Sequence, residues 1–373
     1  MFLALRELRH GKLRFLMIGM ILVLISWLVF ILSGLGNGLS TLAAASFKNM
    51  DANYVVYEEN SRASMSRSTL SEDLVKELES QSNVESAAPM GTSSGTILKD
   101  DKSDEKQKID ITILGINPGT FLEPAVIEGK GLSENNPEGV IVNQTLKDKG
   151  LKIGDTLELE GSTEKLKIIG FVENESYNHL PVVFSTMEKW RAIQFAAPGS
   201  DKGVQLPVNA IMLQGTDIDP AAINNNFDGI ETVTKTQAIQ GLPGYKEENG
   251  TIMMMLAFLL AISAVVIAVF FYVLTLQKSN QFGIMKAIGA SNGFLGKVIV
   301  SQVSILSLIS ILIGTLLTIG TAAALPKEMP FALDPMLVIV YALILFAISV
   351  LSSFLSVRKI TKIDPLQAIG RVE

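Results

Sequence analysis

The sequence predicts an α-helical membrane protein with four transmembrane helices and a large extracytoplasmic α+β domain inserted between helices 1 and 2. Three observations support this fold class: four long uncharged apolar segments, a polar insertion after the first of them, and an uneven distribution of basic residues. Of the 373 residues, 48% are hydrophobic and only 18% are charged, whereas soluble proteins carry about 25% charged residues. This composition disfavours an ordinary cytosolic enzyme.

The four apolar segments contain no Asp, Glu, Lys, Arg or His. They are Phe15–Leu35, Thr251–Leu276, Val298–Leu325 and Met336–Val357, with 21, 26, 28 and 22 residues. A bilayer core about 30 Å thick requires roughly 20 apolar residues, so each segment is long enough to span it. Buried helices of globular proteins usually keep a polar stripe, which these segments lack. We therefore predict transmembrane helices over residues 15–36, 251–276, 298–325 and 336–357.

The first apolar segment could also be the core of a cleaved signal peptide, because basic residues precede it and Ala43–Ala45 follow it. Signal-peptide cores have about 7–15 apolar residues, however, and this segment has 21. We therefore expect it to be retained as the first span.

The basic residues predict the orientation. Residues 1–14 sum to +3, the loop 277–297 to +3 and the tail 358–373 to +2, while the whole chain is at −6. Lys and Arg near the ends of spans mark the cytoplasmic side, so both termini and this loop are expected inside. The 37–250 insertion and the short 326–335 loop are then outside. Apolar and basic residues also alternate over 1–14, which predicts a cytoplasmic amphipathic helix on the inner leaflet.

The 37–250 insertion has the composition of an α+β domain. Thr69 and Glu72 have the spacing of a capping box before a helix that runs to about Gln81. The nearly all-charged stretch Lys99–Lys108 is expected at a hairpin tip. Strands are expected at 53–58, around Ile109, Ile111 and Ile113, and at 139–142, 156–159, 166–172 and 208–213, and short helices at 144–149, 186–194 and 219–226.

The sequence contains no recognisable catalytic or metal-binding set. It has no cysteine and only two histidines, His10 and His179, which excludes disulfides, thiolate chemistry and a multi-histidine metal site. It also lacks the paired-histidine zinc motif and the phosphate-binding loop. The acidic outer segment argues against nucleic-acid binding. We therefore predict no catalytic residue, no metal site and no cofactor of its own.

The loop after the second span contains a short apolar helix. Phe282, Ile284, Met285 and Ile288 are expected on one face, and Gly289 can end the helix. An apolar face on a cytoplasmic loop usually indicates a partner. The tail Ile363–Ile369 begins with Asp-Pro and continues as an amphipathic turn.

The loop Phe-Gly-Ile-Met-Lys-Ala-Ile-Gly-Ala and the tail Ile-Asp-Pro-Leu-Gln-Ala-Ile resemble those of the permease subunits of MacB/FtsX-type ABC transporters. The resemblance implies a coupling helix between spans two and three, a homodimer in the lipid bilayer, and two copies of a separate ATPase that binds ATP-Mg. The ATPase-coupling residues are then Phe282, Gly283, Ile284, Met285, Lys286, Ala287, Ile288 and Gly289.

Within that family, the length and the lack of a fused ATPase resemble the DevC/HrtB-like branch, which implies heme export from the cell membrane of a Gram-positive bacterium. The stretches Asn174–Phe184 and Leu242–Tyr245 look like those that carry heme-associated tyrosines. The candidate heme-binding residues are Tyr177, His179, Tyr245, Met253, Met254, Met255, Trp27 and Phe30. Phenolate can bind ferric heme iron. The alternative is that Tyr177 is an ordinary strand residue and Tyr245 an interfacial aromatic residue.

Three functions remain open at this stage. The leading one is a permease subunit that, with a separate ATPase, exports an amphipathic ligand, most simply heme. The second is an FtsX-like mechanotransmission subunit that activates an external partner without transport. A transporter needs ligand-sized space at the outer ends of spans one and two, whereas a transmission device can pack them shut. A membrane enzyme is the weakest of the three.

Overall fold

The structure is a computed structural model that describes residues 12–99, 107–326 and 329–360. The helix predicted over 1–14, the hairpin tip predicted over Lys99–Lys108 and the tail 363–369 lie largely or wholly outside the described residues. The chain divides into two compact units, a helical unit of Met1–Gly38 with Asn249–Glu373 and an inserted domain of Leu39–Glu248. Each unit is treated separately below.

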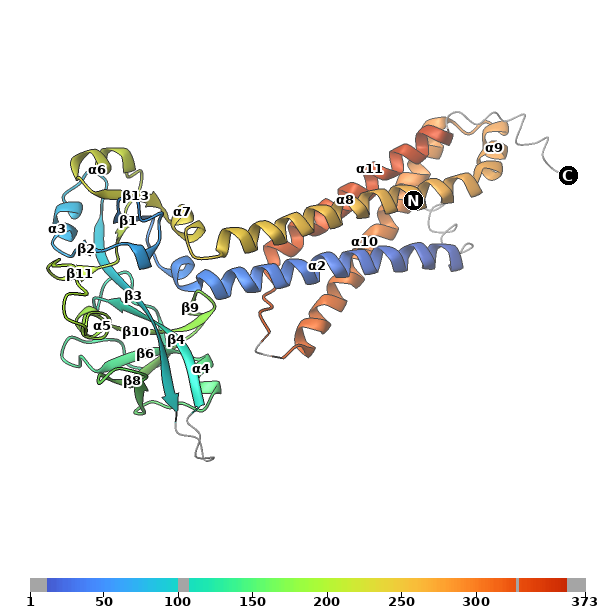
Figure 1. Cartoon of the computed structure of the whole chain (residues 1–373). Helices are drawn as coiled ribbons and strands as arrows, with labels where there is room; N and C mark the ends of the chain where they lie inside the picture. The colour runs from blue at the N-terminus through green and yellow to red at the C-terminus, as the bar shows by residue number, and fades with distance from the viewer. Residues whose placement is uncertain (1–11, 100–106, 327–328, 361–373) are drawn as a thin grey trace. The chain divides into compact units, whose positions relative to one another are not determined.

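The helical unit contains four helices that are long and apolar enough to cross a membrane (Figure 1). They are α2 (Lys12–Asn49), whose last part belongs to the inserted domain, α8 (Tyr245–Gln277), α10 (Asn292–Ala324) and α11 (Pro335–Ile360). A short helix, α9 (Ser279–Ala287), lies between α8 and α10. These helices are longer than the uncharged segments, because polar residues at either end of an apolar segment can continue the same helical hydrogen bonds.

Small residues bring α2 and α10 close together. A Cβ added to Gly314 of α10 would lie 2.3 Å from Ser26 Oγ, and Ser310 Oγ donates to the Gly19 carbonyl at 3.2 Å. Contacts of this kind are typical of membrane helices, which associate through close packing and hydrogen bonds because lipid is as apolar as their side chains. The packing of α2 on α10 therefore depends on the size of these residues.

The inserted domain is built on a mixed sheet with helices on its faces (Figure 1). Its helices are α3 (Leu74–Glu79), α4 (Thr145–Asp148), α5 (Met187–Gln194), α6 (Pro220–Asn226) and α7 (Lys235–Gln240), with a 3-10 turn at Met65–Arg67. Its strands are β1 (Tyr54–Glu58), β2 (Leu70–Ser71), β3 (Ser86–Lys99), β4 (Gln107–Ile116), β5 (Val126–Gly129), β6 (Gly139–Asn143), β7 (Thr156–Leu159), β8 (Lys165–Val172), β9 (Ser176–Tyr177), β10 (Leu180–Thr186), β11 (Pro207–Val208), β12 (Ala210–Gln214) and β13 (Ile230–Thr234).

The main sheet has eleven strands, and the order along its main path is β13-β1-β12-β3-β4-β10-β6-β8-β5. The pairs β4–β10 and β6–β8 are parallel, and the other pairs along this path are antiparallel. Strand β7 pairs with both β3 and β8, which closes β3, β4, β10, β6, β8 and β7 into a ring. The sheet therefore has a closed part and an open extension of β12, β1 and β13.

Both faces of the sheet are buried, and successive side chains of one strand enter different cores. Val56 and Ile113 belong to one cluster, while the adjacent residues Val55 and Leu114 belong to the other. This alternation follows from the two-residue period of a strand. The second cluster also contains Ala44, Phe47 and Met50, so the last turns of α2 are part of this domain's core.

A pair of glycines accommodates Trp190 of α5. Gly91 on β3 lies directly opposite Gly115 on β4, and a Cβ on either would lie within 2.5 Å of Trp190. The indole is fully buried. The two glycines thus form a notch in the sheet that fits one large side chain.

The predicted capping box at Thr69 and Glu72 is wrong. Residues 70–71 form strand β2, the Thr69 amide donates to the Glu58 carboxylate at 3.0 Å, and α3 begins only at Leu74. Glu72 instead pairs with Arg191 and accepts a hydrogen bond from Asn117 at 3.0 Å. Tertiary partners therefore occupy both polar groups on which the predicted box depended.

Candidate functional site

Helix α2 is kinked at Ala44, whose φ of −142° and ψ of 16° are not helical. The carbonyl oxygens just before the kink accept hydrogen bonds from the β9–β10 hairpin. The pairs are Ser176 Oγ to Thr41 O at 3.1 Å, His179 N to Leu42 O at 3.1 Å and Asn178 N to Ala43 O at 2.8 Å. Helices kink where outside groups enter the backbone ladder, and here the hairpin supplies those groups. The hairpin is therefore fixed to this end of α2.

The hairpin turn presents His179. Asn178 and His179 both have positive φ, 50° and 64°, as the two central residues of a type I′ turn do. Asparagine and histidine are both enriched among the non-glycine residues that adopt this conformation. Its Nε2 lies 3.2 Å from Glu248 Oε2 in the first turns of α8. The turn thus places a histidine beside the start of α8 within the inserted domain.

Tyr177 has a different environment, although it is only two residues from His179. Its side chain is buried in the second core cluster, with its ring centroid 5.7 Å from that of Phe47. Burial raises the pKa of Tyr177 well above its usual value, because an apolar environment disfavours the charged phenolate. In the described conformation Tyr177 is a core residue.

Tyr245, the first residue of α8, belongs to a polar cluster with two residues of α2. Its hydroxyl lies 2.8 Å from Ser40 Oγ, and the Lys48 ammonium donates to the same Ser40 oxygen at 2.8 Å and to the Ser40 carbonyl at 3.1 Å. The ammonium also lies 6.0 Å from the centroid of the Tyr245 ring, which is within cation–π range. We call Ser40, Lys48 and Tyr245 the entry cluster.

The structure brings together some of the sequence-predicted ligand residues. His179 and Tyr245 meet the first turns of one helix, since Glu248, the partner of His179, is one helical turn after Tyr245. Sequence reasoning missed Ser40, Lys48 and Glu248. No local pattern identifies them, because their placement depends on the kink and on residues 40 and 245 being neighbours.

The remaining candidate ligand residues lie in the helical unit. Met253, Met254 and Met255 are exposed on α8. Trp27 Nε1 donates to Thr321 Oγ1 of α10 at 3.1 Å, and Phe30 is fully buried. The methionines thus form an open apolar surface, while the two aromatic residues are engaged in helix packing.

The glycines at the outer end of the first predicted span are positions of close approach. A Cβ on Gly36 would lie 2.5 Å from Ile252 of α8, and Cβ atoms on Gly34 and Gly38 would overlap Phe331 and Pro330 of the loop between α10 and α11. The Ala332 amide also donates to the Gly34 carbonyl at 3.1 Å. This end of α2 is therefore packed closely in the described conformation, and the bend in the helix occurs later, at Ala44.

The short helix α9 has two apolar faces instead of the single face expected. Phe282 is 1% exposed and packs in the helical core, with Met285 partly buried against the same cluster, whereas Ile284 and Ile288 are 52% and 81% exposed. Gly289, with φ of 99°, ends the helix as expected. The Ala290 amide donates to Met285 O at 2.9 Å and the Gly289 amide to Lys286 O at 3.0 Å, which is a Schellman motif. Phe282 thus fixes the helix, and Ile284 and Ile288 remain free for a partner.

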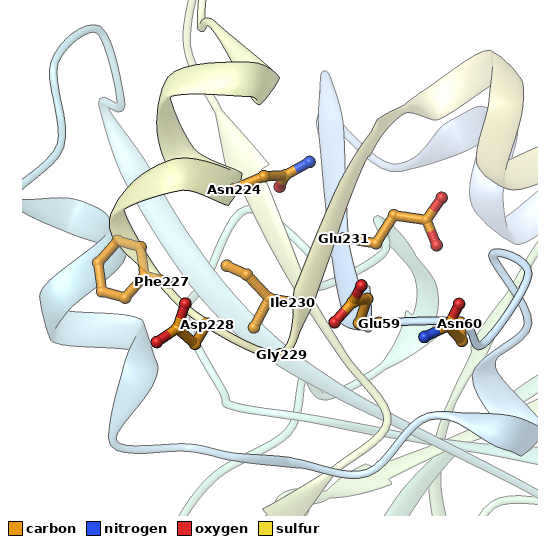
Figure 2. A pocket seen from close by; sticks show the side chains of 8 residues that line it. All are labelled: Glu59, Asn60, Asn224, Phe227, Asp228, Gly229, Ile230 and Glu231. Carbon is orange, nitrogen blue, oxygen red and sulfur yellow. The ribbon is translucent and has the colours of Figure 1, made fainter.

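Two cavities in the inserted domain contain none of the predicted ligand residues. The first, of about 450 Å³, is lined by Glu59, Asn60, Asn224, Phe227, Asp228, Gly229, Ile230 and Glu231 (Figure 2). The second lies between the end of α2, the 121–127 loop and Glu173–Glu175. Among the described residues no group of three carboxylates, histidines or cysteines could hold a metal ion. The acidic lining of the first cavity therefore provides no metal site.

Comparison with known proteins identifies the family. The MacB-like periplasmic core domain model matches residues 16–229, and the FtsX-like permease C-terminal model matches residues 253–365. The chain belongs to the MacB/FtsX family of ABC-transporter permeases. The four apolar helices and the extracytoplasmic domain between the first two agree with the predicted fold class, which is confirmed, and the chain is a multi-pass membrane protein.

Relatives match this MacB/FtsX-family permease over its full length. The putative hemin transport system permease protein HrtB of Staphylococcus haemolyticus is 26% identical over 371 residues, covering 100% of this chain and 99% of that protein. An uncharacterized ABC transporter permease of Mycobacterium tuberculosis is 24% identical over 376 residues, with 99% of each covered. The periplasmic region of MacB from Actinobacillus actinomycetemcomitans aligns with a TM-score of 0.37 at 13% identity, covering 52% of this chain and 94% of that one.

Proposed function

We propose that this chain is the permease subunit of an exporter that, with a separate ATPase subunit, extrudes heme from the membrane. The observation that carries the proposal is the full-length similarity to a staphylococcal protein named as a putative hemin transport permease. The chemistry of the entry cluster and its neighbour His179 supports it, because phenolate and imidazole both bind heme iron. The chain would supply binding and conformational change, and ATP-Mg would act on the partner.

The proposed assembly is a homodimer of the permease with two copies of the ATPase. Ile284 of α9 and Ile288, the residue after the helix, form the exposed apolar contact for the ATPase, while Phe282 holds the helix in place. The basic residues of 277–297 support a cytoplasmic position for this loop and for both termini. The staphylococcal relatives support the cell membrane of a Gram-positive bacterium as the location.

The proposed iron-contacting residues are Tyr245 and His179 of the inserted domain. In the helical unit, exposed Met253, Met254 and Met255 stay candidate ligand residues, because methionine packs adaptably against flat rings. Trp27, which donates to Thr321 of α10, and the fully buried Phe30 also stay candidates in that unit. Tyr177 could reach an iron atom only if the hairpin left the core. Substitution of each tyrosine alone therefore separates the two candidates.

The test is hemin titration of the full chain purified with its ATPase, followed by the hemin absorption spectrum and by ATP hydrolysis. We expect hemin to shift the spectrum and stimulate hydrolysis, and Tyr245→Phe to weaken hemin binding and lower cellular hemin tolerance. Tyr54→Phe, which changes a partly buried tyrosine elsewhere in the domain, is the matched control. Parent-like binding by the Tyr177→Phe/Tyr245→Phe double variant would make both tyrosines structural.

One observation favours the alternative, an FtsX-like mechanotransmission subunit. Gly34, Gly36 and Gly38 of α2 pack closely against Phe331, Ile252 and Pro330, which is the close packing that a transmission device allows at the outer end of the first span. Reconstituted vesicles distinguish the two functions. A transporter removes hemin from the vesicle membrane only when ATP is hydrolysed, whereas a transmission subunit leaves hemin in place while ATP changes the protease sensitivity of the outer domain.

A further inference from the structure

The entry cluster contains a cation that the proposed iron ligation does not use. The Lys48 ammonium has three N–H donors, and Ser40 accepts from it through its hydroxyl and its carbonyl. Both acceptors are neutral, and no ion pair joins Lys48 to a carboxylate in the described part of the chain. The positive charge beside Tyr245 is therefore uncompensated.

The position of this ammonium is built by the fold. Ser40 and Lys48 are eight residues apart, which would be about 12 Å along a straight helix. The kink at Ala44 lies halfway between them, so the helix does not run straight from Ser40 to Lys48, and the Lys48 ammonium reaches the Ser40 oxygens. A partly exposed neighbour stabilises that part of the chain, because the Lys235 ammonium donates to the carbonyls of Lys48 at 2.9 Å and Met50 at 2.6 Å. The backbone that carries Lys48 is thus held in place.

The cluster combines two recognition elements in a small volume. The Tyr245 hydroxyl and the Lys48 ammonium each lie 2.8 Å from one Ser40 oxygen, so a molecule that contacts the phenol is also near the cation. Heme and its metal-free analogue are planar rings with carboxylates at one edge. Charge-assisted hydrogen bonds between an ammonium and a carboxylate are about twice as strong as neutral ones. The Lys48 ammonium therefore offers a charged donor for an anionic group at the edge of such a ring.

We propose that Lys48 is the carboxylate-recognition residue of the ligand site, with Ser40 positioning its ammonium so that it pairs with an edge carboxylate of a planar tetrapyrrole beside Tyr245. The inference rests on the proposed function and adds to it the group that distinguishes a dicarboxylate from a neutral ring. It assigns iron contact to Tyr245 and carboxylate contact to Lys48, so the two roles can be separated with different ligands.

The test uses the full chain purified with its ATPase in lipid-free detergent, which removes lipid phosphates as competing anions. Hemin, hemin dimethyl ester, protoporphyrin IX and its dimethyl ester are titrated against the parent, Lys48→Met, Lys48→Arg, Tyr245→Phe and Lys246→Met. Lys246 is an exposed lysine next to Tyr245 that has no hydrogen bond to Ser40, so its substitution makes the same charge change outside the cluster.

We expect the parent to bind each free acid about three- to tenfold more tightly than its ester, a range typical of a partly exposed ion pair. Lys48→Met should remove this preference, Lys48→Arg should retain it and Lys246→Met should behave like the parent. Tyr245→Phe should lose the hemin spectral shift while still preferring free protoporphyrin IX over its ester. A merely structural role of Lys48 would lower thermal stability without changing the acid-to-ester ratio.

The inference alone is overturned by a parent that binds hemin and its ester equally, or by an acid preference that survives in Lys48→Met. Loss of the preference in Lys246→Met as well would also overturn it, because the attraction would then be a general effect of positive charge. A parent that binds none of the four ring compounds overturns the proposed function and this inference together.

Discussion

The glycine notch beneath Trp190 gives a prediction whose magnitude follows from the structure. In Gly91→Ala the new Cβ would lie 2.3–2.4 Å from three indole carbons of Trp190, a fully buried side chain on α5. Something must shift, and the rigid ring cannot fold away as a flexible side chain would. Overpacking of a well-packed core costs about 1–3 kcal/mol. For a domain of about 200 residues this lowers Tm by roughly 2–12 °C.

The chain contains only two tryptophans, Trp27 and Trp190, so fluorescence can report on this site directly. In a Trp27→Phe background, thermal unfolding is followed through Trp190 emission for the parent, Gly91→Ala and Gly95→Ala. Gly95 is on the same strand, and a Cβ there meets Leu159 at an ordinary 3.4 Å, so Gly95→Ala is the matched control. If Gly91→Ala matches Gly95→Ala in both Tm and emission maximum, the notch does not hold the indole as described.

Three further predictions concern coupling, protonation and topology. Ile284→Asp, at an exposed position of α9, should leave the chain normally folded but abolish copurification of the ATPase. Phe282→Ala should instead lower Tm, because it removes about 3–5 kcal/mol of core packing. Normal copurification with Ile284→Asp would exclude α9 as the docking element. Burial raises the pKa of Glu175 in the folded protein, so ionising this carboxyl destabilises the folded state as pH rises above the pKa that it has in the unfolded chain. Glu175→Gln should therefore raise Tm at neutral pH, and this gain should vanish as pH falls through the folded-state pKa. A gain that does not depend on pH would contradict the assignment. In this cysteine-free chain, an impermeant thiol reagent added to intact cells should label Lys102→Cys and leave Lys286→Cys unlabelled; the reverse pattern would invert the proposed orientation.

The membrane helices could be predicted from sequence because their signal is local. Each is a continuous apolar segment of sufficient length, and no distant residue has to be known. The same holds for the end of α9, where a single glycine in the left-handed region completes the Schellman motif. The orientation of the spans and the roles of the candidate ligand residues stay predictions.

Features that depend on distant partners could not be predicted. Strand β3 is rich in Gly, Ser and Ala, and its sequence favours a loop. It forms a strand because β4 and β12 pair with it on either side, and its Gly91 leaves the space that the Trp190 ring fills. The side chains of α9 divide between a core contact and an exposed surface, and only the position of the neighbouring helices decides which residues belong to which face. The kink at Ala44 falls in a run of three alanines, which by itself favours a straight helix. Local preference gives way in each case to a tertiary contact.

The contact between Ser40 and Tyr245 has a consequence for how such a chain folds. These residues stand at the two ends of the inserted domain, and their hydroxyl oxygens are 2.8 Å apart. The entropy lost in bringing two distant points of a chain together grows with the length of the loop between them. In this chain the entropy cost of bringing residues 40 and 245 together is part of the cost of folding the inserted domain, because folding of the domain brings its two ends together. Once the domain has folded, its two chain ends therefore stay close together, however many residues separate them in the sequence.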